Sequence, residues 1–176
     1  MKKFTLPLLF VALLLLLSGR NEREFTIFMI GDSTMANKKL DGGNPERGWG
    51  FVLPGFFSEE VVIENHAQNG RSTKSFIDEG RWETVRNRIK KGDYVFIQFG
   101  HNDEKSDEKR HTDPGSTFDD NLRKFVNETR EKGGIPVLFN SIVRRNFVDG
   151  ILTDTHGEYR EAPRRVAQEM DVPFID

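Results

Sequence analysis

The feature that most constrains the fold is an alternation of short apolar runs with segments of helical periodicity. The runs are rich in β-branched and aromatic residues, as strands buried on both faces of a sheet are. They cover residues 25–30, 61–65, 94–99, 136–140 and 172–175. Strands that alternate with helices predict a parallel sheet joined by right-handed crossovers and covered on both faces.

Three segments between these runs carry apolar residues at helical spacing. One extends over 118–129, behind Ser116 as a capping candidate, and the others cover 82–89 and 159–170. Pro163 falls within the last of them, where it predicts either a helix start or a kink.

Length and charge limit the class of protein. The chain has 176 residues, which suits one domain, and we assign that domain to residues 21–176. Lys and Arg number 26 against 28 Asp and Glu, with a net charge of -2, so nucleic acid is not an expected partner. The chain has no Cys, which excludes disulfides and thiolate metal sites.

The N-terminus has the layout of a secretory signal. Lys2 and Lys3 precede an apolar run over 4–17, and small residues follow at Ser18 and Gly19. We therefore expect residues 1–20 to be a signal peptide, the mature protein to be secreted or periplasmic, and no stable membrane insertion after cleavage. An uncleaved membrane anchor is the main alternative, because an A-x-A cleavage site is absent. A buried core helix is a further alternative.

A polar turn follows the first apolar run, in the order Gly31, Asp32, Ser33, Thr34. In an open parallel sheet, ligands bind outside the carboxyl ends of the strands. A strand-to-helix turn there would project the Ser33 hydroxyl into a crevice, where it could act as a nucleophile. The alternative is that Ser33 only caps the next helix.

Two more strand ends carry candidate groups. Asn102 follows the third run, and its amide could donate to the oxyanion formed when a hydroxyl attacks an ester. Gly70 follows the second run and could offer its N–H there. The alternatives are an Asx turn at Asn102 and an ordinary turn glycine at Gly70.

In this order, the three turns resemble the first blocks of the SGNH (GDSL-like) hydrolases. The segments "GDSTMA", "RGWG", "NGRSTKSF", "QFGHNDEK", "HTDPG" and "GGIPVLFNSIVRRNF" are similar to the rhamnogalacturonan acetylesterases of that superfamily. The resemblance implies a flavodoxin-like three-layer α/β/α sandwich and a site without a cofactor. It also implies that Ser33 is the nucleophile and one oxyanion donor, with the Gly70 N–H and the Asn102 side chain as the other donors.

The fourth block of that family, Asp-x-x-His, supplies the base that deprotonates the serine. No such pattern follows residue 140. His101 lies inside the third block, where the resemblance implies a packing role, and His156 has the wrong spacing for the base. His66 and His111 are expected in loops or at the surface. No His-x-His or His-Glu-x-x-His arrangement predicts a metal site.

The resulting hypothesis is a serine esterase that removes acetyl groups from plant cell-wall polysaccharide, with rhamnogalacturonan in pectin as the substrate. Because the fourth block is missing, we expect a C-terminally truncated domain, poorly stable and with a weakly activated serine. Acetylated xylan or another short-chain ester is an alternative substrate. A non-catalytic carbohydrate-binding protein is an alternative function. Trp49, Arg47 and Arg71 could contact a sugar or a uronate, or could simply be a loop anchor and solvated charges.

Overall fold

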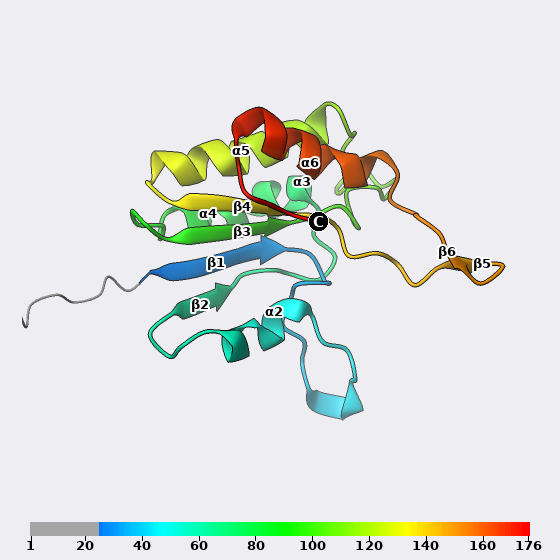
Figure 1. Cartoon of the computed structure of the whole chain (residues 1–176), viewed down its shortest axis with the longest axis horizontal. Coiled ribbons are helices and arrows are strands. Elements are labelled where there is room, and N and C mark those ends of the chain that lie inside the picture. Colours follow the sequence, from blue (N-terminus) through cyan, green and yellow to red (C-terminus); the bar gives the residue numbers. More distant parts are fainter. Residues whose placement is uncertain (1–24) are drawn as a thin grey trace, which may run out of the picture.

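The computed structural model describes residues 25–176, so the signal peptide predicted for residues 1–20 lies outside the described residues. Its centre is a five-stranded parallel sheet in the order β2-β1-β3-β4-β7 (Figure 1). The strands are β1 (Thr26–Gly31), β2 (Val62–Asn65), β3 (Tyr94–Gln98), β4 (Ile135–Phe139) and β7 (Phe174–Ile175). Each apolar run of the sequence therefore forms a strand, and the predicted α/β fold is confirmed.

The strand order reverses at β1. This strand pairs with β2 on one side, where Ile27 lies opposite Ile63, and with β3 on the other, where Gly31 lies opposite Gln98. β2 thus lies on one side of β1, and β3, β4 and β7 follow in order on the other side. In sheets of this order, the carboxyl ends of β1 and β3 border the crevice in which ligands bind.

Four helices pack on one face of the sheet (Figure 1). They are α3 (Thr73–Asp78), α4 (Arg81–Arg86), α5 (Thr117–Glu131) and α6 (Glu158–Met170). The three segments with helical spacing form α4, α5 and α6. Pro163 lies in the second turn of α6, inside the helix rather than at its start.

Ser116 is the N-cap residue of α5, as predicted, but its side chain does not cap the helix. Its hydroxyl donates instead to the Asp113 carbonyl at 3.3 Å. The Asp119 carboxylate accepts from the Gly115 N–H at 2.8 Å and stabilises the chain before the helix. The predicted position of the N-cap is thus confirmed, but the side-chain hydrogen bond expected of it does not form.

The helix-covered face holds the larger core. Phe125 of α5 lies between the rings of Trp82 and Phe99, with ring centroids at 5.0 and 5.6 Å, and is fully buried. Phe76 of α3 meets Phe99 edge to face at 5.4 Å. Aromatic pairs at these separations add to the free energy gained by burying apolar area.

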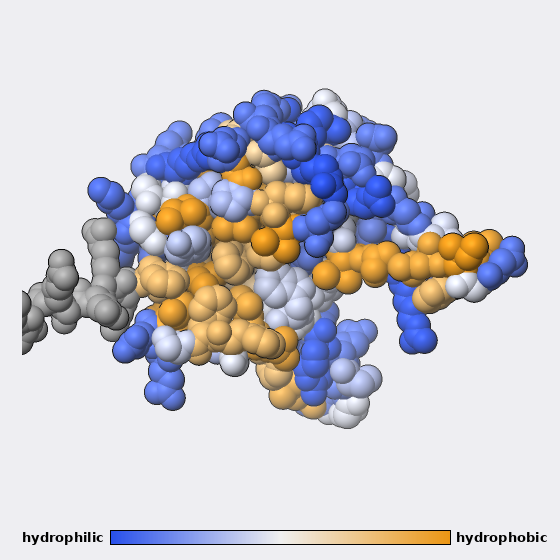
Figure 2. Space-filling view, viewed as in Figure 1, coloured by the Kyte–Doolittle hydropathy of each residue, from blue (hydrophilic) through white to orange (hydrophobic). Residues whose placement is uncertain are grey.

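The opposite face of the sheet has a thin cover. Only the short helix α2 (Trp49–Val52) and the 3₁₀ turn η2 (Leu53–Phe56) lie against it among the described residues, and a further 3₁₀ turn, η1 (Asp41–Gly43), lies in the loop before them. An apolar groove of about 390 Å³ remains over the strands, lined by Phe57, Tyr94, Phe96 and Phe139, among others. Figure 2 shows apolar side chains at the molecular surface between the helices and α2.

A hairpin that the sequence analysis did not predict projects from the body. Its strands are β5 (Phe147–Val148) and β6 (Ile151–Leu152), joined through Asp149 and Gly150, whose φ angles are 50° and 78°. Two positive φ values fit the tight turn that favours Asp-Gly. Figure 2 shows this arm as an apolar projection, and Ile151 is 71% exposed.

No helix within residues 25–176 combines the length and the apolar character needed to cross a membrane.

Candidate active site

The turn after β1 is held by Asp32. Its buried carboxylate accepts both the Thr34 N–H and the Thr34 hydroxyl at 2.8 Å, and the Ala36 N–H bonds to the Asp32 carbonyl at 3.0 Å. Residues 33–35 are a turn and no helix begins there, so the expected strand-to-helix transition and the helix cap at Ser33 are both wrong. The N–H groups of Met35 and Ala36, which a Ser33 cap would have bonded, donate instead to the Asp32 backbone carbonyl at 3.3 and 3.0 Å.

Ser33 is consequently free to face a ligand. It lines a groove of about 730 Å³ together with Lys38, Arg47, Trp49 and Asn69, among others. Within residues 25–176, neither the hydroxyl nor the N–H of Ser33 takes part in a hydrogen bond. The arrangement presents a hydroxyl and a backbone donor at the carboxyl end of β1.

The loop that contains Trp49 packs directly on the Ser33 turn. The Trp49 N–H bonds to the Thr34 carbonyl at 2.9 Å, and the indole N–H bonds to Gln98 Oε1 at 2.7 Å. A Cβ at Gly48 would overlap the Ala36 carbonyl, so only glycine permits this approach. Trp49 therefore anchors its loop and also forms a wall of the groove.

The turn after β2 lies next to the first. The Gln68 N–H bonds to the Gly31 carbonyl at 2.9 Å, and Gly70 has φ +76°, a backbone conformation that glycine adopts without strain. The Gly70 N–H makes no hydrogen bond within residues 25–176. Arg71 is already paired, with Nε 3.0 Å from a Glu79 carboxylate oxygen and NH1 2.9 Å from the Asn69 carbonyl, and it does not line the Ser33 groove.

The turn after β3 joins the second turn through Asn102. One N–H of its side-chain amide donates to the Arg71 carbonyl at 3.1 Å, and the side chain is buried. The second N–H of the amide is a further donor. The structure thus brings the turns of Ser33, Gly70 and Asn102 together, although of these three residues Ser33 alone lines the groove within the described part of the chain.

Asp103 connects this third turn to α3, a role that the sequence analysis missed. Its Oδ1 accepts from the Thr73 N–H at 2.9 Å and from the Thr73 and Thr112 hydroxyls at 2.5 and 2.9 Å. Burial raises the pKa of Asp103 to about 7, because the loss of water outweighs these hydrogen bonds. The carboxyl group therefore carries a proton below neutral pH.

The partly buried His101 and the buried His156 contact each other. The rings of His101 and His156 lie at 4.5 Å, and His101 Nδ1 lies 3.7 Å from Asp32 Oδ2. Burial, followed by the charges of His156 and Arg144, lowers the pKa of His101 to about 4. Burial also lowers the pKa of His156, whose Nε2 lies 3.0 Å from the Ile142 carbonyl oxygen. Both rings are therefore neutral at neutral pH.

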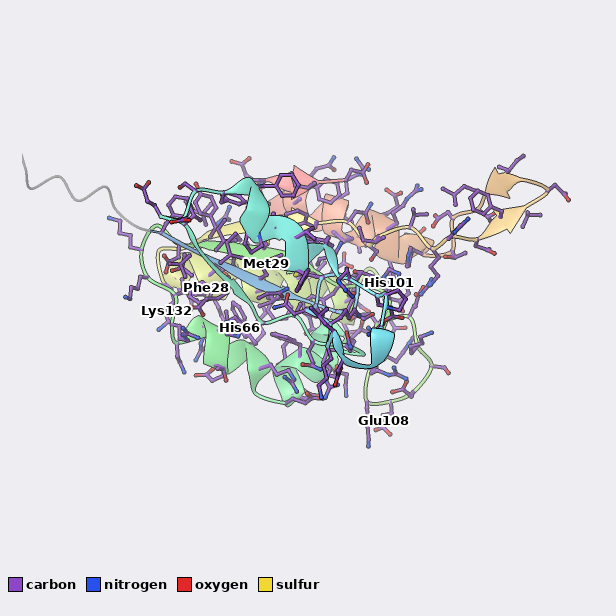
Figure 3. All side chains as sticks on the ribbon, turned by 90° about the horizontal axis from the view of Figure 1, so that it is seen from below. Phe28, Met29, His66, His101, Glu108 and Lys132 are labelled. Atoms are coloured by element: carbon purple, nitrogen blue, oxygen red, sulfur yellow. The ribbon has the colours of Figure 1, made fainter. Side chains whose placement is uncertain are left out.

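The other histidines lie elsewhere. Figure 3 shows His66 beside Phe28 and apart from His101, and its Nε2 is 3.1 Å from a Glu64 carboxylate oxygen. His111 is exposed and contacts Asp113 at 3.1 Å. Within residues 25–176 no histidine lines the Ser33 groove, so the geometry assigns no histidine base to Ser33.

A metal site is not formed by the described residues: no group of three or more His, Asp or Glu side chains in 25–176 is arranged to hold an ion. The predicted absence of a cofactor stays a prediction.

The comparison with sequence families identifies the chain's relatives. The model of the GDSL-like lipase/acylhydrolase family matches residues 29–176. Rhamnogalacturonan acetylesterase RhgT of Bacillus subtilis is 44% identical over 156 residues, which are 88% of this chain and 66% of the relative. Probable rhamnogalacturonan acetylesterase YesY of the same organism is 32% identical over 85% of this chain and 69% of its own length. The chain thus spans about two thirds of the length of these relatives.

Solved structures share the fold. The crystal structure of YxiM from Bacillus subtilis superposes with a TM-score of 0.75 and 26% identity, covering 88% of this chain and 44% of that chain. Axe2, an acetylxylan esterase from Geobacillus stearothermophilus, gives a TM-score of 0.62 at 21% identity over 86% of this chain and 75% of its own. From its turns, its sheet order and these relatives, the chain belongs to the GDSL-like lipase/acylhydrolase family.

Proposed function

We propose that the chain carries the nucleophile and the oxyanion donors of a carbohydrate acetylesterase. The observation that supports this best is the free Ser33 hydroxyl in a groove at the carboxyl end of β1, beside two turns that offer further donors. Relatives of this chain are named rhamnogalacturonan acetylesterases, so acetylated rhamnogalacturonan is the substrate we propose.

The reaction follows from the groups that converge. The Ser33 hydroxyl attacks the acetyl carbonyl carbon, a C–O bond forms, and the carbonyl oxygen takes a negative charge. The N–H groups of Ser33 and Gly70 and the Asn102 amide would hold that charge. Collapse of the intermediate breaks the bond between the acetyl carbon and the sugar oxygen, which takes up the proton that Ser33 has lost and leaves as a hydroxyl. The acetyl-serine that remains is hydrolysed by water to acetate and free serine.

The experiment compares the wild type with Ser33→Ala and with Ser58→Ala, a matched control at an exposed serine outside the groove. Acetate release is measured from acetylated rhamnogalacturonan, acetylated xylan and an aryl acetate. We expect Ser33→Ala to lower kcat by at least about a thousandfold, as removal of a serine nucleophile does, and Ser58→Ala to leave it unchanged. Equal activity of wild type and Ser33→Ala would refute the assignment of Ser33 as the nucleophile. Faster acetate release from acetylated xylan would replace rhamnogalacturonan by xylan as the proposed substrate.

A second candidate is glycan binding without catalysis. It is favoured by one observation, that no histidine of residues 25–176 lines the Ser33 groove. Binding of acetylated oligosaccharide that is equal in wild type and Ser33→Ala, with no acetate released by either, would establish it. A burst of phenol from an aryl acetate, equal to one per chain and released without acetate, would instead show that the serine acylates.

We also propose that the protein is exported, on the basis of the basic and apolar pattern of residues 2–17. N-terminal sequencing of the extracellular product tests this: a start near residue 20 supports cleavage, and recovery only with the cell membrane would favour the anchor.

A further inference from the structure

Lys38 is unusual among the cations near the groove because its side chain is almost entirely buried. It follows the Ser33 turn in the chain, and its side chain is 7% exposed. Nζ donates to Asn69 Oδ1 at 2.8 Å and lies 3.9 Å from a carboxylate oxygen of Glu46, whose side chain is 71% exposed. The side-chain stem is buried while the bond from Nζ to Asn69 is exposed, and Asn69 is the nearer of the two acceptors.

Asn69 is held at two points. Lys38 bonds to its side-chain oxygen, and Arg71 NH1 donates to its carbonyl oxygen at 2.9 Å. That carbonyl belongs to the same planar peptide unit as the Gly70 N–H, so a constraint on one end of the unit orients the other. Gly70, at φ +76°, has a wide choice of backbone conformations and needs such a constraint.

The same contact adds a side-chain link between two turns whose backbones meet at the Gln68 N–H and the Gly31 carbonyl. Lys38 belongs to the segment after Ser33, and Asn69 belongs to the turn after β2, 31 residues later. Both line the groove with Ser33. A 2.8 Å bond between them therefore constrains the nucleophile turn and the Gly70 turn at the groove itself.

We propose that Lys38 is a positioning residue: through Asn69 it orients the Asn69–Gly70 peptide and so places the Gly70 N–H relative to Ser33. This inference rests on the proposed esterase function, because that function gives the Gly70 N–H its role.

The test uses Lys38→Met, which keeps the length of the side chain and removes its charge and donors. Lys39→Met is the matched control, since Lys39 is the adjacent, exposed lysine. Lys38→Arg restores a cationic donor. The first measurement is the NMR chemical shift of the Gly70 amide, and the second is kcat and KM on a neutral aryl acetate.

We expect Lys38→Met to shift the NMR signal of the Gly70 amide and to lower kcat about tenfold with KM within about twofold, less than the loss of a whole oxyanion donor. Lys38→Arg recovers most of kcat, and Lys39→Met changes neither quantity. Asn69→Ala reproduces the effect, and combining it with Lys38→Met adds little, because both remove one interaction.

An unchanged Gly70 amide in Lys38→Met overturns the proposal, whatever happens to activity. A loss seen only on uronate-containing substrates, with the Gly70 amide unchanged, would assign Lys38 to substrate charge instead. If the wild type releases no acetate while the Gly70 amide responds to Lys38→Met, the esterase function fails and the positioning role of Lys38 stands.

Discussion

The two faces of the sheet carry similar strand residues but differ in what covers them. In β1, Phe28 and Ile30 point to the face covered by α3 to α6, whereas Ile27 and Met29 point to the face of α2. All four side chains are at most 2% exposed. Toward β4, however, the second face opens into the apolar groove over Phe96. The apolar content of a strand thus predicts burial near the centre of the sheet and says little about its cover at the edge.

The largest expected effect is on the helix-covered face. Phe125→Ala removes a fully buried ring that contacts Trp82 and Phe99, and we expect it to lower the free energy of unfolding by about 3–5 kcal/mol. Urea unfolding followed by circular dichroism measures this. A loss below about 1.5 kcal/mol would mean that this core is less tightly packed than its geometry indicates.

The matched change on the other face is Phe96→Ala. Phe96 is partly buried, lies 5.0 Å from the Phe139 ring and lines the apolar groove, so its removal leaves less of a cavity. We expect a loss of about 1–2 kcal/mol, because less area is withdrawn from water. If Phe96→Ala lowers the free energy of unfolding as much as Phe125→Ala in the same urea titration, the two faces of the sheet do not differ in packing.

A pH titration sharpens the comparison through Asp103, which bonds to α3 on the covered side. Its pKa is about 7 in the folded protein against 3.8 unfolded, so the folded state holds more protons between these values. The free energy of unfolding therefore falls as pH rises through this window, by up to about 1.4 kcal/mol per pH unit. His101, with a pKa lowered from 6.5 to about 4, acts in the opposite sense between pH 4 and 6.5.

The two slopes are separated by substitution. Thermal or urea unfolding of Asp103→Asn and His101→Gln is followed from pH 4 to 8. Relative to the wild type, Asp103→Asn should lose the decline toward pH 7, and His101→Gln should lose the rise below pH 6.5. A difference between Asp103→Asn and wild type that does not vary with pH would contradict the raised pKa.

The smallest expected effect concerns the open groove. Phe57→Asp places a charge in the lining of this groove. Phe56→Asp is the control, because the neighbouring Phe56 is 80% exposed and does not line the groove. We expect both to change the free energy of unfolding by less than about 0.5 kcal/mol, as surface changes do. Fluorescence of anilinonaphthalene sulfonate should fall for Phe57→Asp only. Equal fluorescence in both variants would show that the dye does not use the groove.

Strands and long helices were predictable because apolar periodicity is a local signal. The runs at 25–30 and 94–99 became β1 and β3 within one residue at each end, and α5 extends the predicted 118–129 by one or two residues. The β5–β6 hairpin was missed although Asp149 and Gly150 between apolar pairs are its usual signal. Its strands are only two residues long, too short for a periodic pattern to stand out.

The candidate site was only partly predictable. Ser33, Gly70 and Asn102 were predicted because each follows a strand, and the structure brings their turns together. The helix expected at Ser33 does not form, and the Met35 and Ala36 amides that a Ser33 cap would bond donate to the Asp32 carbonyl instead. Lys38 gave no signal, since its partner Asn69 is 31 residues away and only the folded chain brings them together.

The strand order also has a consequence for synthesis on the ribosome. β1 pairs with β2 and β3, the next two strands to emerge, and the turns of Ser33, Gly70 and Asn102 all lie before residue 104. The groups of the candidate site can therefore meet while α5 and α6 are still in the exit tunnel or untranslated, leaving the apolar face that these helices later cover exposed in the nascent chain. The candidate site would thus form before α5 and α6 stabilise the domain. In that interval the nascent chain exposes the most apolar surface to a chaperone.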